Sequence, residues 1–361
     1  MRQRWMVGSL ALALVLAACG DDGPGDEVAA DCEVGEVDGD LTFFNWSDYI
    51  DPDLVDAFEA EYGVSVTQDF YPSNEEMLAI VQAGGAQYDV VVPSDYMVSI
   101  MIEEELLLEI DRDVVPNHTN LGAEFLDPPY DDGSRYSLAY QWGTTGLGVN
   151  LDAVGEDVEA SWALVFDPEL ASQFSGRISL LDDPRETMAS ALFYLGYSPN
   201  TTDEGELEEA MELISAASQH VAAFDSVLYS DLLLTGETVI SHGYSGTFLD
   251  SFGDDESYDY LIPEEGAIIW VDTIAILADT QVPCTAHTFI DFILDAENGA
   301  QLTNWTYYAS PNEAAEPFLD PDILGDPAIY PDDDTMEVLV FLEDTGEAEI
   351  LFNDYFTRAK S

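Results

Sequence analysis

The side chains best placed for chemistry in this sequence are aromatic and acidic residues that directly follow predicted strands. Asn45-Trp46-Ser47-Asp48-Tyr49 follows one apolar run, and Pro93-Ser94-Asp95-Tyr96 follows another. Ligands of open α/β sheets usually bind at the carboxyl ends of strands. Both segments are therefore candidates for a binding site.

Rings and carboxylates together suit a linear amine. Its ammonium ends need carboxylate partners, because an unpaired cation in a cleft is costly. Its methylene chain, flanked by cations, suits aromatic walls that offer apolar surface and cation–π attraction. The candidate walls are Trp46, Tyr49, Tyr96, Tyr244, Trp270 and Tyr308, and the candidate acids are Asp183, Glu186 and Asp272.

Each candidate also has a purely structural interpretation. A Trp or Tyr more often belongs to a core than to a ligand wall. Asp183 and Glu186 also fit a helix start, with Asp183 as the N-cap. Asp272 is different, because it lies inside an apolar run, residues 268–277, where an acid without a purpose would be costly.

The charge is strongly acidic. Eight Lys and Arg residues face 74 Asp and Glu residues, which gives a formal net charge of −66. Nucleic acid is excluded as a partner, because too few cations are available to neutralise phosphates. The acids could steer a cationic ligand, but they are spread over the whole chain. We therefore interpret most of them as a solvated surface suited to high salt.

The N-terminus is typical of an exported protein. Arg2 and Arg4 precede an apolar run, residues 6–18, that is too short for a comfortable membrane span. We predict a signal peptide at 1–18, lipidation at Cys19, and a flexible acidic tether at 19–38. An ordinary secretory signal is the alternative. The predicted location is the periplasm or the outer face of the cytoplasmic membrane, with a lipid as the only membrane contact.

Two further cysteines remain, Cys32 and Cys284. In an exported chain they could form a disulfide. The sequence alone does not show whether their Cα atoms come within reach, so the bond stays open at this point.

Strand and helix patterns alternate along the chain. This alternation predicts an α/β fold with a largely parallel sheet. A second α/β region spans 146–268, and a strand near Trp270 crosses back to the first. The first lobe contains predicted strands at 41–45, 64–70 and 88–92, helices at 51–62 and 73–84, and a later helix at 287–301.

Three rival interpretations compete with a cation site. Catalysis is disfavoured, because residues 243–247 lack the last glycine of the G-x-S-x-G pattern and Asp183 and Glu186 lie too close in sequence to flank a bond. A ferric-iron site could use Tyr307 and Tyr308. A sugar site would not need three carboxylates, and an amino-acid site would need an Arg, for which only Arg185 is available.

At these residues the chain resembles the polyamine-binding proteins of bacterial ABC importers. The resemblance extends over nearly the whole chain after about residue 39. The similar stretches are Asn45-Trp46-Ser47-Asp48-Tyr49, Val91-Val92-Pro93-Ser94, Asp182-Asp183-Pro184-Arg185-Glu186, Pro263-Glu264-Glu265-Gly266, Trp270-Val271-Asp272 and Tyr330-Pro331-Asp332.

The resemblance implies a two-lobed periplasmic-binding-protein fold of the type II kind, with the ligand cleft between the lobes. Two crossing strands, near 140–149 and near Trp270, would form the hinge. The implied lobes are 39–145 plus 271–316 and 146–270 plus 317–361.

The resemblance also implies the site. Ser47, Asp48 and Ser94 match positions at one end of the ligand. Three departures stand out: Tyr244 replaces a Trp, Asp95 adds a carboxylate, and residues 338–344 lack a Gln that some members use. The implied ligand-binding residues are Trp46, Ser47, Asp48, Tyr49, Ser94, Asp95, Tyr96, Asp183, Glu186, Tyr244, Trp270, Asp272 and Tyr308.

The implied function is that of a monomeric, non-enzymatic solute-binding protein. It would capture putrescine or spermidine and deliver it to an ABC permease, without a cofactor or a bound metal. A same-fold protein for a sugar or ferric iron is the alternative, since a fold does not fix its ligand.

Overall fold

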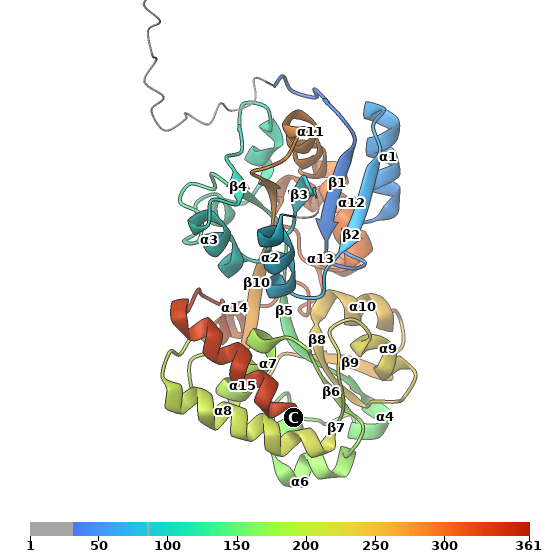
Figure 1. The fold of residues 1–361 in the computed structure, drawn as a ribbon. Coiled ribbons are helices and arrows are strands. Elements are labelled where there is room, and N and C mark those ends of the chain that lie inside the picture. The colour runs from blue at the N-terminus through green and yellow to red at the C-terminus, as the bar shows by residue number, and fades with distance from the viewer. Residues whose placement is uncertain (1–31, 85–86) are drawn as a thin grey trace, which may run out of the picture. The chain divides into compact units, whose positions relative to one another are not determined.

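The computed structural model describes residues 32–84 and 87–361. Two long antiparallel strands, β5 (Ser137–Asn150) and β10 (Ala267–Leu277), lie side by side at its centre (Figure 1). Every residue of β10 is buried, as expected for a strand covered on both faces. The predicted signal peptide, the lipidation at Cys19 and the predicted tether up to residue 31 lie outside the described residues. Residues 32–38, predicted as the end of that flexible tether, are instead fixed by a disulfide at Cys32 and by hydrogen bonds between Asp38 and Thr285.

One sheet runs through both lobes in the order β2-β1-β3-β10-β5-β8-β6-β7. The strands pair in parallel at its two ends, and β5 and β10 join the ends by antiparallel pairing. The predicted α/β fold with two crossing strands is therefore confirmed. The remaining strands are β1 (Leu41–Asn45), β2 (Val66–Phe70), β3 (Val90–Val91), β4 (Leu107–Leu108), β6 (Ile178–Leu180), β7 (Val221–Phe224), β8 (Ile240–Tyr244), β9 (Tyr258–Leu261) and β11 (Leu339–Val340).

The first lobe surrounds β1, β2 and β3. Phe289 packs edge-on against Phe43 and Phe58, with ring centroids 5.1 and 5.0 Å away, so α11 is fixed against β1 and α1. Its helices are α1 (Pro52–Tyr62), α2 (Asn74–Ala83), α3 (Asp95–Glu103), α11 (Pro283–Ile293) and α12 (Ala296–Thr306), with 3-10 turns η1 (Pro116–Asn120), η2 (Ala123–Phe125) and η5 (Glu313–Phe318).

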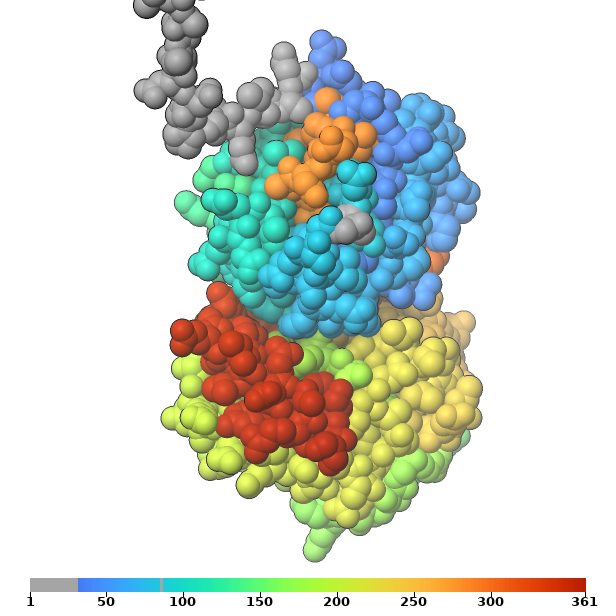
Figure 2. All heavy atoms as spheres, in the orientation of Figure 1, coloured from blue at the N-terminus to red at the C-terminus, as the bar shows by residue number. Residues whose placement is uncertain are grey.

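The second lobe surrounds β6, β7 and β8. The C-terminal helix α15 packs on α7 and α8, and Figure 2 shows the C-terminal segment, in red, spread over this lobe up to its boundary with the first. The helices are α4 (Leu151–Val154), α5 (Ala163–Phe166), α6 (Pro168–Ala171), α7 (Pro184–Leu195), α8 (Glu204–Ala217), α9 (Tyr229–Leu234), α10 (Ser245–Phe252), α14 (Asp333–Met336) and α15 (Glu349–Ala359), with 3-10 turns η3 (Ser172–Phe174), η4 (Ser218–His220) and η6 (Gly346–Ala348). The short helix α13 (Pro321–Leu324) is linked to α12, because the N–H of its N-cap residue Asp320 donates to the Asn304 side chain.

Local capping signals explain where the early helices begin and end. The Ser73 hydroxyl accepts a hydrogen bond from the Glu76 N–H and so begins α2. Gly63 and Gly84 end α1 and α2 in the left-handed conformation, which glycine adopts without a steric penalty. These boundaries confirm the sequence prediction.

The single helix predicted at 287–301 is wrong. The chain forms α11 and α12 instead, and Asp295 separates them. The Asp295 side chain accepts hydrogen bonds from the backbone N–H groups of Glu297 and Asn298 and so begins a new helix. Pro283 at the first turn moves the start of α11 to before His287.

The predicted lobe boundaries fall inside secondary structure. The limits at 145/146 and 270/271 lie within β5 and β10, and the limit at 316/317 lies within η5. Both long strands are shared by the two lobes. Within the described ranges, no helix is both long enough and apolar enough to cross a membrane.

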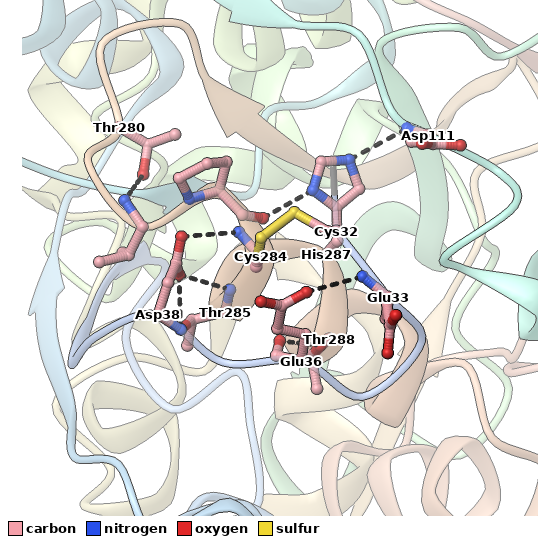
Figure 3. Close-up of a disulfide and its surroundings, with 12 residues drawn as sticks. Cys32, Glu33, Glu36, Asp38, Asp111, Thr280, Cys284, Thr285, His287 and Thr288 are labelled. Carbon is pink, nitrogen blue, oxygen red and sulfur yellow. Dashed lines mark hydrogen bonds between the residues drawn. A yellow bond between two sulfur atoms is a disulfide. The ribbon is translucent and has the colours of Figure 1, made fainter. Parts of the chain in front are cut away.

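A disulfide joins Cys32 to Cys284 at the start of α11, with 5.4 Å between the Cα atoms (Figure 3). Next to it, the Asp38 carboxylate accepts hydrogen bonds from the backbone N–H groups of Cys284 and Thr285. The His287 ring bonds to the Pro283 carbonyl and accepts from the Asp111 N–H. Cys284 and His287 are thus both engaged in structural contacts.

Candidate functional site

One pocket between the two lobes gathers every ligand-binding residue predicted from the sequence. Residues from strands and helices far apart in the chain meet there because both lobes direct strand ends toward the pocket. The predicted residues that line it are Trp46, Ser47, Asp48, Tyr49, Ser94, Asp95, Tyr96, Asp183, Glu186, Tyr244, Trp270, Asp272 and Tyr308.

Strand ends position most of these side chains. Residues 46–49 follow β1, and residues 94–96 follow β3 at the start of α3. Residues 183–186 follow β6 at the start of α7, and Tyr244 ends β8. Trp270 lies within β10, two residues before Asp272.

Aromatic rings form the walls. Tyr308 packs edge-on against Trp270 and Tyr49, with ring centroids 5.2 and 5.3 Å away. The Tyr244 ring packs edge-on against Trp270, with ring centroids 6.0 Å apart. The Tyr308 hydroxyl bonds to the Thr247 hydroxyl at 2.9 Å. Fixed rings of this kind offer a rigid apolar and electron-rich surface.

Two glycines leave room for these rings. A Cβ atom added at Gly143, opposite Trp270 in the β5–β10 pair, would lie 2.8 Å from the Trp270 ring and 3.0 Å from the Tyr308 ring. A Cβ atom at Gly246 would lie 2.6 Å from the Tyr308 ring. The Trp270 and Tyr308 rings can therefore occupy these places only because Gly143 and Gly246 have no side chain.

Asp272 and Asp95 form the acidic end near β10. Asp272 is 6% exposed and accepts a hydrogen bond of 2.6 Å from the Ser94 hydroxyl. It precedes a register shift between β10 and β5, and such irregularities redirect side chains near functional sites. Asp95 is 2% exposed and accepts from the backbone N–H groups of Tyr96 and Val271 at 2.7 and 3.3 Å.

Burial changes the protonation of these two acids. Loss of solvent raises the pKa of Asp272 to about 7, although the hydrogen bond from Ser94 acts in the opposite direction. Loss of solvent likewise raises the pKa of Asp95 to about 7, against its backbone hydrogen bonds. Both carboxyls thus titrate near neutral pH when no cation is bound.

Asp183 and Glu186 form the acidic end in the second lobe. Asp183 is the N-cap of α7 and accepts from the backbone N–H groups of Arg185 and Glu186 at 2.9 and 3.0 Å. Burial raises the pKa of both carboxyls, and the charge of Asp183 raises the pKa of Glu186 further. Asp183 therefore both caps α7 and lines the pocket.

Several buried polar atoms of pocket-lining residues lack a hydrogen-bond partner among the described residues, and two of them differ in chemical character. These two are Oε2 of Glu186 and Nε1 of Trp270. Buried polar groups are normally paired. An acceptor and a donor left open in a pocket wall are therefore available to a bound molecule.

Arg185 lies beside these acids but does not line the pocket. Its guanidinium forms an ion pair with Glu349 and donates to the Asn200 side chain at 3.2 Å. It also lies over the Tyr96 ring of the first lobe, 5.3 Å from the centroid. The nearest guanidinium is thus already engaged by a carboxylate outside the pocket.

The sequence analysis missed several lining residues. Tyr71 directly follows β2, and Ser226 follows β7 by two residues, so the strand-end rule would have found both. Thr247 follows β8 by three residues at the start of α10 and fits the same rule, whereas Leu342 follows β11, a strand of only two residues that carries no comparable sequence signal. The missed residues are Tyr71, Pro72, Asn74, Ser226, Val227, Tyr229, Thr247 and Leu342.

The adjacent tyrosines considered for iron do not act together. Tyr308 lines the pocket, whereas Tyr307 ends α12 in the left-handed conformation and is not among the lining residues. In the described part of the chain, no group of three or more His, Cys, Asp or Glu side chains is arranged to hold a metal ion.

Comparison with known proteins agrees with this architecture. Residues 53–331 match the family described as bacterial extracellular solute-binding protein. A putrescine/cadaverine-binding protein of Pseudomonas aeruginosa is 39% identical over 318 residues, covering 86% of this chain and 90% of its own. A spermidine/putrescine-binding periplasmic protein of Escherichia coli is 35% identical over 323 residues, covering 89% and 91%.

A solved structure shares the fold as well. The spermidine/putrescine ABC transporter substrate-binding protein PotD of Streptococcus pneumoniae superposes with a TM-score of 0.73 at 31% identity, covering 90% of this chain and all of its own. The two-lobed architecture and the sequence match lead to one assignment: this chain belongs to the family of bacterial extracellular solute-binding proteins.

Proposed function

We propose that this protein binds a polyamine, such as putrescine or spermidine, and delivers it to an ABC permease. One observation carries the proposal: four buried carboxyls, Asp95, Asp183, Glu186 and Asp272, line a single aromatic-walled pocket. Buried acids without cationic partners are costly, and a ligand with several ammonium groups supplies those partners.

The relatives support the choice of ligand. Their names state putrescine, cadaverine or spermidine as the solutes that those proteins bind. The aromatic and acidic residues inferred from the resemblance all line the same pocket here. A short polyamine has a methylene chain for the rings and an ammonium group at each end for a carboxylate pair.

Binding would proceed by closure of the lobes. The first lobe supplies Tyr49 and Tyr96, the second supplies Glu186 and Tyr244, and β10 supplies Trp270. A ligand that contacts both lobes stabilises the closed form, and β5 and β10 serve as the hinge. Closure excludes water and so strengthens each carboxylate–ammonium contact. The closed protein then docks on the permease.

The alternatives fit the pocket less well. A neutral sugar would leave four buried acids without cationic partners. A ferric-iron site built on adjacent tyrosines would need both Tyr307 and Tyr308, and only Tyr308 lines the pocket. The pocket carboxyls do not form a metal-holding group within the described residues. The Ser245 hydroxyl of the incomplete G-x-S-x-G pattern is buried and accepts a hydrogen bond from the Thr144 N–H, and Ser245 does not line the pocket.

The place of action follows from the N-terminal sequence. We propose export by a signal peptide at 1–18 and lipid attachment at Cys19, with the chain acting as a monomer outside the cytoplasmic membrane. The relative from Escherichia coli is named as a periplasmic protein. Incorporation of labelled palmitate into the wild-type chain, but not into Cys19→Ala, would support this anchor.

Calorimetric titration of the signal-free protein with putrescine, spermidine and spermine tests the proposal. We expect saturable one-to-one binding that persists at high salt, because the acids are buried and poorly screened. Weak binding to many sites that disappears with salt would show that only the acidic surface had been titrated. Saturable binding of a sugar in place of any amine would replace the ligand assignment.

A further inference from the structure

Arg185 is a buried cation next to a site for cations. Its side chain is 1% exposed, and it lies between Asp183 and Glu186 in the first turn of α7. Its positive charge favours the ionised forms of both carboxyls and so acts to lower their pKa, against the effect of burial. A guanidinium in this place has the same preferred partners as the ammonium group of a ligand.

Contacts from the C-terminal part of the chain hold Arg185 away from those partners. Its Nη1 pairs with Glu349 at the start of α15, which lies beside α7 in Figure 1. Its Nη2 donates to the Glu343 carbonyl at 3.1 Å and to Asn200. The guanidinium also lies over the Phe352 ring, 4.6 Å from its centroid.

Glu349 is itself fixed in place. The backbone N–H and the hydroxyl of Thr345 donate to its Oε1 at 3.2 and 2.9 Å. Neither Glu349 nor Arg185 lines the pocket, although Leu342 from the same C-terminal segment does. The Arg185–Glu349 ion pair therefore lies outside the pocket lining, and Arg185 lies between Asp183 and Glu186 in the sequence at the start of α7.

We propose that Glu349 is a positioning residue: it holds Arg185 outside the pocket and prevents this internal cation from competing with the bound amine for Asp183 and Glu186. This inference rests on the proposed function, because it concerns the affinity of the same site for a cation. It adds a determinant on the C-terminal helix, outside the residues that line the pocket.

The physical reason is the cost of a buried charge without a partner. If Glu349 lost its charge, the guanidinium would turn to the nearest carboxylates, because leaving it unpaired in the interior is strongly unfavourable. Asp183 and Glu186 are its neighbours on α7. The amine would then have to displace an arginine before it could bind.

Calorimetry on three variants tests this competition. Glu349→Gln should weaken putrescine binding roughly tenfold or more, because the Arg185 charge would lose its partner and compete with the ligand ammonium for Asp183 and Glu186 at short range. Glu349→Gln combined with Arg185→Met should restore the affinity, since the competing cation is gone. Glu347→Gln is the matched control: it removes one charge from an exposed glutamate of the same segment and should bind like the parent.

Two outcomes would overturn the proposal. One is an unchanged Kd in Glu349→Gln, with only the fraction of active protein or the melting temperature reduced, which would indicate a structural role. The other is a double variant that binds as weakly as Glu349→Gln, because removal of the arginine would then relieve nothing.

A measurement without ligand separates this inference from the function itself. Carbon-13 NMR titration of the Asp183 and Glu186 carboxyls should show lower pKa values in Glu349→Gln than in the parent, and no such decrease in the double variant. If the decrease appears in a protein that binds no polyamine, the role of Glu349 stands and the ligand assignment fails. If the pKa values do not change, the role of Glu349 is refuted whatever the ligand.

Discussion

At the scale of single residues, the pocket combines carboxylates, whose burial is unfavourable, with aromatic rings, whose burial is favourable. Asp272 shows this most clearly, because it interrupts a largely apolar strand and accepts a hydrogen bond from the Ser94 hydroxyl but has no ion-pair partner among the described residues. A fold gains nothing from a carboxylate in this place. Its presence is explained when a cation completes its coordination.

Removing that charge should therefore reduce binding more than it affects folding. We expect Asp272→Asn to weaken putrescine binding roughly 10- to 100-fold, because a hydrogen bond to a charged group contributes about 1.5–3 kcal/mol. Isothermal titration measures the change, with the exposed Asp354→Asn as a control for net charge. Equal affinities for the two variants would remove Asp272 from the site.

Affinity should also depend on pH, with a sign that follows from the raised pKa values. Asp95 and Asp272 carry protons below a pKa of about 7 in the free protein, while an alkyl amine stays charged up to a pH of about 10. Binding selects the ionised carboxyls, so the affinity should fall as the pH decreases from 8 to 6, by up to about tenfold per pH unit for each proton displaced.

The same acids affect folding in the opposite direction. Because their pKa is raised in the folded state, they stabilise the free protein below a pH of about 4, and this contribution is lost as the pH rises through about 7. The increase in melting temperature caused by putrescine should therefore be larger at pH 8 than at pH 6. Thermal melts of the parent and of Asp272→Asn check this, and an equal pH dependence in both would contradict it.

At the scale of secondary-structure elements, the paired strands β5 and β10 cross between the lobes and position the aromatic walls. Gly143 of β5 lies opposite Trp270 of β10, and the space above this glycine is occupied by the Trp270 and Tyr308 rings. The position of the walls is thus set by the backbone of the neighbouring strand.

Gly143→Ala should displace those rings. The added methyl group would lie within 3.0 Å of both rings, which is too close for a stable contact. We expect weaker putrescine binding, by roughly tenfold, together with a loss of stability of about 1–3 kcal/mol from overpacking. Titration and urea unfolding measure the two effects, and Ser215→Ala on the exposed face of α8 serves as the control. Parent-like binding would show that the rings can move aside.

The disulfide belongs to the same scale, because it fixes the segment before β1 to α11. It closes a loop of 252 residues, and disulfides typically contribute about 2–5 kcal/mol to stability. We expect Cys32→Ser with Cys284→Ser to lower the urea midpoint while leaving the Kd for putrescine unchanged, since neither cysteine lines the pocket. A large change in Kd would link this end of the first lobe to the site.

The sequence revealed the fold and most of the site for identifiable reasons. Strand ends and capping residues are local signals, so residues 46–49 and the start of α2 could be read directly. Leu342 follows a strand of only two residues, so its place in the pocket depends on tertiary packing. The break at Asp295 was missed because apolar residues continue on both sides of it, and only the cap geometry ends the first helix.

At the scale of the whole molecule, a net charge of −66 determines the conditions under which the protein folds. Like charges at this density repel one another in the compact state. We expect the melting temperature to rise between about 0.1 M and 1 M NaCl, as the screening length falls from about 10 to 3 Å. Scanning calorimetry measures the rise. A rise that sucrose reproduces equally would point to excluded-volume effects instead.

The position of Trp270 and Asp272 on a strand shared by both lobes has a consequence for protein engineering. If the lobes close as proposed, substitutions at these two residues should change ligand contacts and closure together, whereas Tyr244 and Ser226 belong to the second lobe alone. A fluorescent biosensor built on this protein should therefore keep the sequence of β10 unchanged, because this strand would couple ligand binding to the movement of the lobes. Its selectivity should be varied at the second-lobe positions, where recognition can be altered without changing the readout.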